Sequence, residues 1–182
     1  MDADLVVRAQ GGDKDAYALV ASEIADRFLA VARRILRDRD LAEDATQQAL
    51  LSIWRDLPQL RDPGRFEAWS YRLLVNACYA EGRKERRWTP NLRVLPIDEG
   101  TADRRLDAVV DRDQLERGFR RLTMDQRTVV VLYHYLDKPL DEIARILGIP
   151  VGTAHSRLHH AMRGMRAALD ADARLTAREA SR

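Results

Sequence analysis

The sequence has few of the residues that build disulfide scaffolds, membrane spans or sheets. Its 182 residues include one cysteine, Cys78, so no internal disulfide can form. No apolar run approaches the roughly 20 residues that cross a bilayer, and the first residues, MDADLVVRAQGGDKD, are acidic rather than signal-like. Nowhere do apolar and polar residues alternate between turn signals as they do in a strand. These absences predict a cytoplasmic, all-α protein without membrane insertion.

Carboxylates are missing where a metal site would need them. The stretch HSRLHH places His155 and His159 four residues apart, the spacing of the paired ligands in a helical zinc-protease motif. That motif needs a glutamate at its second position, which here is Ser156, and no acidic residue occurs between Arg145 and Leu169. The chain also lacks a nucleophile–base pair, a glycine-rich phosphate loop and a carboxylate pair. We therefore expect no metal, no cofactor and no enzymatic activity.

Charge is abundant but unevenly spread. Charged residues make up 33% of the chain and hydrophobic residues 46%, and the net charge is +2. Residues 61–93 have a net charge of +4 and residues 126–182 of +3, whereas residues 1–60 and 94–125 are net negative. Two separate basic segments favour two contacts with a polyanion.

Helical periodicity dominates the sequence. Apolar residues recur at steps of three and four, as in Phe28, Val31, Ala32 and Ile35. Proline and glycine interrupt this pattern at residues 58–65 and again at residues 87–105. We expect two small helical domains joined by a flexible linker: residues 1–86, a linker over 87–110, residues 111–170, and a polar tail over 171–182.

The second domain has the pattern of a helix-turn-helix. Ile143, Ala144 and Leu147 share one face of a first helix, which should stop at Gly148, and Pro150 marks the start of a second. In the second helix one stripe should be buried: Ala154, Leu158, Ala161 and Met165.

The histidines lie off that stripe and should face outward with Ser156 and Arg163. Three interpretations compete: a solvated polar face, a metal pair, and a DNA-contacting face. The metal pair lacks the second-shell groups that orient histidine ligands. DNA contact is favoured, because an outward face rich in donors and free of acids suits the major groove.

The segment RRLTMDQRTVVVLYHYLDKPLDEIARILGIPVGTAHSRLHHAMRGMR resembles region 4 of bacterial RNA polymerase sigma factors, in the extracytoplasmic-function (ECF) group. The chain keeps much of the group's pattern around Glu142 and from Pro150 to Leu158, but has His155 and His160 where basic residues are usual. The resemblance implies docking on the −35 promoter element through these residues: Thr153, His155, Ser156, Arg157, His159, His160 and Arg163.

A second resemblance lies upstream. RDRDLAEDATQQALLSIWRDL is similar to sigma region 2.2, which implies binding to the clamp helices of the polymerase β′ subunit. The residues expected at this contact are Glu43, Asp44, Gln47, Gln48 and Leu51. An ordinary amphipathic core helix would explain Leu50, Ile53, Trp54 and Leu57, but not the polar face.

RFEAWSYRLLVNACYAEGRKERR is similar to regions 2.3–2.4, which implies capture of the melted −10 element, with a flipped base held partly by the loop Pro58–Arg65. Stacking rings, polar side chains and a cationic track suit single-stranded DNA. For Trp69, a core role and a role as a wedge are both open. The residues expected at the −10 element are Arg61, Arg65, Phe66, Trp69, Tyr71, Arg72, Asn76, Arg83, Lys84, Arg86 and Arg87.

The two resemblances stand in the family's order along one chain. They imply an alternative sigma factor, monomeric when free, whose partners are core RNA polymerase (the β′ clamp helices and the β flap) and promoter DNA. They leave open an anti-sigma factor as a further partner. Two other classes compete: a stand-alone helix-turn-helix regulator with a ligand- or protein-binding first domain, and a metal-dependent hydrolase. The regulator would footprint duplex DNA without polymerase, and the hydrolase would need bound zinc.

Overall fold

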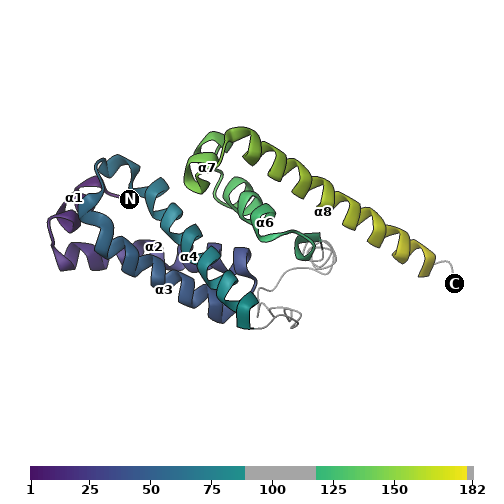
Figure 1. The fold of residues 1–182 in the computed structure, drawn as a ribbon, viewed down its shortest axis with the longest axis horizontal. Coiled ribbons are helices and arrows are strands. Elements are labelled where there is room, and N and C mark those ends of the chain that lie inside the picture. Colours follow the sequence, from purple (N-terminus) through teal and green to yellow (C-terminus); the bar gives the residue numbers. More distant parts are fainter. Residues whose placement is uncertain (89–117, 180–182) are drawn as a thin grey trace. The chain divides into compact units, whose positions relative to one another are not determined.

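The computed structural model describes residues 1–88 and 118–179, and the side chains of residues 1–85 and 118–170. The described residues form helices and turns and contain no strand, so the predicted all-α class is confirmed. The chain divides into two compact units, which are described one at a time (Figure 1). Apart from residues 87 and 88, the expected linker over 87–110 lies outside the described residues. The start of the second domain, predicted at residue 111, also lies outside them.

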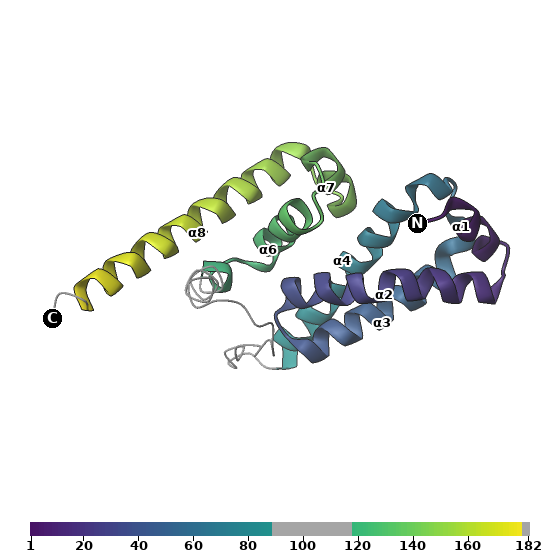
Figure 2. The same cartoon turned by 180° about the vertical axis from the view of Figure 1, so that it is seen from behind.

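Four helices build the N-terminal unit: α1 (Ala3–Gln10), α2 (Lys14–Leu36), α3 (Arg39–Asp56) and α4 (Phe66–Trp88). Aspartates cap the first three. The side chain of Asp13, for example, accepts hydrogen bonds from the backbone N–H groups of Asp15 and Ala16, which satisfies donors that the first helical turn leaves unpaired. Helix α3 packs against both α2 and α4, which also contact each other (Figures 1 and 2).

The core of this unit contains the apolar residues that the periodicity predicts. Phe28, Val31, Ala32 and Ile35 of α2 are at most 1% exposed. Trp54 is an exception, because 38% of its surface remains exposed although its spacing is that of a core position.

Two short 3-10 helices connect α3 to α4, where the prolines and the glycine predict a loop. They are η1 (Leu57–Gln59) and η2 (Pro63–Arg65). The side-chain amide of Gln10, at the end of α1, donates hydrogen bonds to the carbonyl oxygens of Leu57 (3.2 Å) and Leu60 (2.7 Å). The connection is therefore held against the first helix.

The C-terminal unit contains α6 (Met124–Val130), the π-helical turn η3 (Val131–Tyr135), α7 (Leu140–Leu147) and α8 (Val151–Glu179). Thr123 and Gln126 form a capping box at the start of α6. Gly148, which follows α7, has φ of +65°, a conformation that favours glycine at the end of a helix. The predicted helix-turn-helix is thus α7 and α8.

The stripe predicted to be buried on the second helix does face the core. Ala154 and Ala161 are fully buried, and Leu158 and Met165 pack partly buried against the cluster formed by Leu122, Val130 and Ala161. Helix α8 also continues through residues 171–179, which the sequence predicts as a polar tail. Within the described residues, every helix is too short or too polar to cross a membrane.

Candidate functional site

One face of α3 exposes a continuous polar stripe. Helical geometry places residues 43, 44, 47, 48 and 51 on the same side, and all five are exposed. The opposite side of the helix is buried against the core by Ala42, Ala45, Thr46, Ala49 and Ile53. The residues that the sequence predicts to contact polymerase therefore lie together, and we call Glu43, Asp44, Gln47, Gln48 and Leu51 the α3 stripe.

The first residue of the stripe is already paired. Glu43 Oε1 lies 2.9 Å from Arg39 Nε and 3.3 Å from Arg33 Nη2. The hydrogen bond from Arg39 is the main cause that lowers the pKa of Glu43 below its usual value. Because Arg33 belongs to α2, Glu43 joins the end of α2 to the start of α3. The polar side chains of the stripe that are more available to a partner protein are therefore those of Asp44, Gln47 and Gln48.

A largely apolar groove of about 450 Å³ runs beside the α3 stripe. The rings of Tyr17 and Trp54 form its wall, with centroids 4.7 Å apart, and the Tyr17 hydroxyl donates a hydrogen bond of 2.5 Å to the Leu50 carbonyl. Burial raises the pKa of Tyr17, so the hydroxyl stays a donor. Leu51 is 56% exposed and shared by groove and stripe. Leu51 and Trp54 together give this surface an apolar centre beside its polar row.

The −10 residues predicted from the sequence fall into two groups. Arg61, Arg65, Arg72, Asn76, Arg83 and Lys84 are exposed. Phe66 and Tyr71 are only 3% and 2% exposed, and Trp69 is half-buried. Arg86 and Arg87 lie in α4, outside the residues whose side chains are described. The exposed group can meet a strand directly, whereas the two buried rings can do so only through a cavity.

Two of the exposed cations also have acidic neighbours. Arg65 Nε lies 3.2 Å from Asp62 Oδ2 on the connection between α3 and α4. Lys84 Nζ lies 2.6 Å from Glu81 Oε1, and the side chain of Glu81 is only 8% exposed. Lys84 therefore balances a buried carboxylate, which leaves less of its charge for a phosphate.

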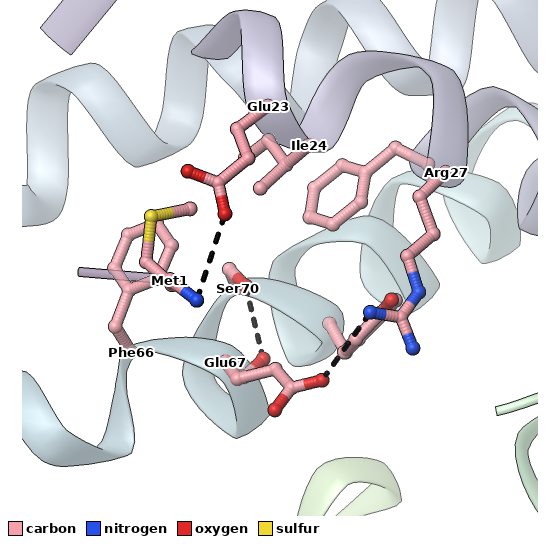
Figure 3. A pocket seen from close by; sticks show the side chains of 9 residues that line it. Met1, Glu23, Ile24, Arg27, Phe66, Glu67 and Ser70 are labelled. Carbon is pink, nitrogen blue, oxygen red and sulfur yellow. Dashed lines mark hydrogen bonds and ion pairs between the residues drawn. The ribbon is translucent and has the colours of Figure 1, made fainter. Parts of the chain in front are cut away.

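A pocket of about 140 Å³ opens between α2 and α4 (Figure 3). The buried rings of Phe28, Phe66 and Tyr71 belong to its lining. Arg27 of α2 and Glu67 of α4 point toward one another across it, with 3.8 Å between Nη1 and Oε1. The complete lining is Met1, Glu23, Ile24, Arg27, Phe28, Phe66, Glu67, Ser70 and Tyr71.

Helix α8 presents most of the predicted −35 residues together. His155, Ser156, His159, His160 and Arg163 are exposed and Thr153 is half-buried. The Ser156 hydroxyl donates a 3.0 Å hydrogen bond to the Thr153 carbonyl. The rings of His159 and His160 are 5.8 Å apart, edge to face.

Arg157 is placed differently from its neighbours on α8. Its Nη2 atom lies 2.7 Å from Asp125 Oδ2 of α6, and its side chain is 27% exposed. The guanidinium is thus directed toward the first turn of α6, where it pairs with a partly exposed carboxylate.

The side chains of residues 1–85 and 118–170 include no group of three or more potential metal ligands of the His, Cys, Asp or Glu type. Cys78 is fully buried, and burial raises the pKa of its thiol to about 12. The thiol is therefore protonated and shielded at neutral pH.

Four residues of these surfaces were missed by sequence reasoning: Tyr17, Arg27, Glu67 and Asp125. Tyr17 and Arg27 lie outside the quoted motifs, and Glu67 and Asp125 lie within them at positions to which the resemblance assigns no role. Each contacts a residue of another helix that lies 32 to 40 positions away in the sequence. The contacts are the aromatic pair Tyr17–Trp54 and the ion pairs Arg27–Glu67 and Arg157–Asp125. The only one of the four that the sequence could indicate is Tyr17, whose large aromatic side chain lies near the predicted buried face of its helix.

Comparisons with known proteins agree on both halves of the chain. Residues 21–88 match the family of Sigma-70 region 2, and residues 112–165 match Sigma-70 region 4. The RNA polymerase sigma-H factor of Pseudomonas aeruginosa is 29% identical over 186 residues, covering 92% of this chain and 93% of that protein. The ECF RNA polymerase sigma-E factor of Haemophilus influenzae is 28% identical over 172 residues, covering 88% of this chain and 90% of that protein.

Two solved structures share the fold. CnrH in complex with the cytosolic domain of CnrY matches with a TM-score of 0.67 and 24% identity, over 94% of this chain and 98% of that chain. The sigma factor RpoE in complex with the anti-sigma factor NepR, from Bartonella quintana, matches with a TM-score of 0.65 and 22% identity, over 86% of this chain and 98% of that chain.

Proposed function

This chain belongs to the sigma-70 family, in its ECF group, and from that premise we propose how its residues divide the work of an alternative sigma factor. Sigma factors of this kind recognise promoters and initiate transcription, and they are not enzymes. We assign residues 1–86 to the region 2 domain, 87–110 to the linker, 111–170 to the region 4 domain and 171–182 to a tail. The protein acts in the cytoplasm, as a complex with core RNA polymerase.

The α3 stripe is the contact with core polymerase. It is exposed along its whole length while the other side of the same helix is buried, and apart from Glu43, which pairs with Arg33 and Arg39, its side chains are not needed for the packing of the core. Acidic and amide side chains at such a surface favour a basic helical partner, and their charge guides association. Leu51 and Trp54 provide the apolar contact that a stable interface needs beside its polar row. This stripe is the observation that carries the proposal.

The two DNA contacts follow from the exposed residues of α4 and α8. Arg72, Asn76 and Arg83 lie on α4, where cations and an amide suit the backbone and base edges of a single strand. His155, His159 and His160 lie on the second helix of a helix-turn-helix, the element that enters the major groove. Phosphate contacts position such a helix and side chains on base edges provide sequence preference.

An anti-sigma factor is a further candidate partner of this chain. The solved RpoE structure contains one, and the groove beside the α3 stripe offers an exposed apolar surface to any protein that competes with polymerase. The stand-alone helix-turn-helix regulator is disfavoured, because the first domain matches Sigma-70 region 2 and the relatives aligned over most of the chain are sigma factors.

A comparison of promoter binding with and without polymerase tests the proposal. The free chain should give no footprint on a promoter that the chain and core polymerase protect together, because a sigma factor binds well only in holoenzyme. A footprint of the free chain on duplex DNA, unchanged by core polymerase, would instead identify a stand-alone regulator.

A further inference from the structure

Three of the chain's four histidines form one exposed cluster on α8. His155, His159 and His160 are all exposed, and the ring centroids of His159 and His160 lie 5.8 Å apart. His155 lies one turn before His159, so the two share a side of the helix. The buried residues Ala154 and Ala161 lie on the opposite side. The three histidines, which we call the histidine face, are therefore open to a ligand.

The fixed charges on the same side of α8 are positive. Arg163 and Arg166 are exposed, and helical spacing places them beside the histidine face. No acidic residue occurs in the sequence between Arg145 and Leu169. A ligand that meets the histidine face therefore meets no carboxylate from these turns of the helix.

The carboxylates of the neighbouring elements are directed to other partners. Asp125 of α6 pairs with Arg157, with 2.7 Å between Oδ2 and Nη2, and Glu142 of α7 pairs with Lys138, with 3.1 Å between Oε1 and Nζ. Among the side chains that the structure describes, no carboxylate pairs with the histidine face. The other charged or titratable residues of the elements beside α8 are Arg120, Arg121, Arg127, His134, Asp137, Asp141 and Arg145.

This composition makes the charge of the histidine face depend on pH. Histidine is the side chain that ordinarily changes its charge between pH 5 and 8, whereas an arginine stays charged throughout that range. A neutral imidazole has one donor and one acceptor, and a protonated imidazole has two donors and no acceptor. Protonation therefore turns the histidine face into a set of positively charged donors, which suits phosphates and the N7 and O6 acceptors of guanine.

Entry into the major groove favours the protonated form. Phosphates attract a histidinium more strongly than a neutral imidazole, and no described carboxylate pairs with these histidines to take the place of the phosphates. The chain therefore holds more protons when it is bound to DNA than when it is not, and by linkage its affinity for DNA rises as the pH falls. Arginine or lysine at positions 155 and 160 would not couple binding to pH in this range.

We propose that the −35 contact of this chain is coupled to protonation: the histidine face takes up protons when α8 enters the major groove, so that promoter binding strengthens as the pH falls from about 8 to about 6. The inference rests on the proposed function of α8 at the −35 element and adds a regulation to that contact. Because neighbouring groups of like charge repel, His159 and His160 accept one proton between them more readily than two. We therefore expect an uptake of about one to two protons per chain.

Promoter binding by holoenzyme at several pH values tests the coupling. Wild-type chain and a triple variant, His155→Gln with His159→Gln and His160→Gln, would each be assembled with core polymerase and titrated onto the same promoter. Glutamine keeps a donor and an acceptor but takes up no proton in this range. The affinity of the wild type relative to the variant should rise about fivefold or more from pH 8 to pH 6. The ratio cancels any effect of pH on the polymerase itself.

Two further variants separate charge from other causes. His155→Arg with His160→Arg fixes the positive charge, so it should bind more tightly than the wild type at pH 8, and the difference should shrink toward pH 6. His134→Gln is the matched control, because His134 is an exposed histidine on η3, outside the histidine face. It should keep the whole response of the wild type. The salt dependence of wild-type binding should also be steeper at pH 6 than at pH 8, by about one in the slope for each proton that neutralises a phosphate.

The outcomes separate the inference from the proposed function. If wild-type holoenzyme binds the promoter and the folded triple variant shows the same change of affinity with pH, the coupling is wrong while the proposed function stands. The same holds if the arginine variant, shown to be folded by circular dichroism, has no advantage at pH 8, or if His134→Gln alone removes the response. If the wild-type chain brings core polymerase to no promoter at any pH, the proposed function itself is wrong and the inference goes with it.

Discussion

Arg157 of α8 and Asp125 of α6 form an ion pair, with 2.7 Å between Nη2 and Oδ2. The pair connects the helix that carries the histidines to the helix behind it, where the capping box of Thr123 and Gln126 holds the first turn. Arg157 belongs to the residues that the sequence assigns to the −35 element. In the structure it fits a positioning role, because the pair ties α8 to α6 beside the buried cluster of Leu122, Val130 and Ala161.

Arg157→Ala and Asp125→Ala should therefore weaken −35 binding by holoenzyme to a similar degree. Partly exposed pairs contribute less than about 1 kcal/mol, so we expect a loss of up to about fivefold in each variant and no further loss in the double variant. The dependence of affinity on salt should not change. A fall in the slope of log affinity against log salt by about one in Arg157→Ala alone would show that Arg157 contacts a phosphate instead.

His155 and His160, unlike Arg157, should affect which −35 sequence is preferred and not the placement of α8. The double variant His155→Ala with His160→Ala removes two exposed side chains that do not pack in the core, so its helical signal and thermal midpoint should remain those of the wild type. Binding to the preferred −35 sequence should fall by about 1–3 kcal/mol, while binding to mismatched sequences changes little. Equal loss on all sequences, or no loss, would mean that the two histidines do not read bases.

Reversal of one charge tests the α3 stripe. Asp44→Arg should weaken binding to core polymerase by about tenfold or more, that is by at least about 1.4 kcal/mol, because a basic partner would meet a like charge. Asp26→Arg, at an exposed position of α2 outside the stripe, changes the net charge equally and should bind as the wild type does. Titration of labelled protein with core polymerase measures both. Equal affinities for the two folded variants would remove the stripe from the interface.

Cys78 provides a probe of the N-terminal unit. Its thiol is buried and its pKa is raised to about 12, so the thiolate that reacts with disulfide reagents forms only when the unit opens. At pH 8 the native protein should react at least about 100-fold more slowly than the protein in urea. Since the folded state favours the protonated thiol, this group's contribution to stability is complete below the usual thiol pKa of about 8.5. The contribution is lost as the pH rises toward 12. Fast labelling of the native protein at pH 8 would show that the bundle around α4 is open.

The helices and their buried faces could be predicted from the sequence because both depend on local spacing. Ala154 and Ala161 illustrate this, since a step of seven residues returns to the same side of a helix wherever that helix lies. The α3 stripe was found for the same reason. Neighbouring polar residues on one helix face are visible in the sequence, and the structure leaves them all exposed.

Contacts between helices could not be predicted in this way. Nothing in the local pattern pairs Arg157 with Asp125, or sets Arg27 against Glu67, because each pair joins two helices whose packing is decided by the whole core. The burial of Phe66 and Tyr71 could not be predicted for the same reason. A family resemblance indicates that a residue contributes to DNA binding, but it does not indicate whether the side chain is exposed or buried. Trp54 is likewise placed by a contact between helices, because its ring packs against Tyr17 of α2 with centroids 4.7 Å apart while 38% of its surface stays exposed.

The central claim, that the chain directs core polymerase to promoters of its own, is tested most directly by run-off transcription. Purified chain would be added to core RNA polymerase with a library of genomic promoters, and the transcripts would be sequenced. The account predicts new transcripts with shared start sites that appear only with the chain and that disappear with Asp44→Arg. Transcription identical with and without the folded chain, across the whole library, would contradict it.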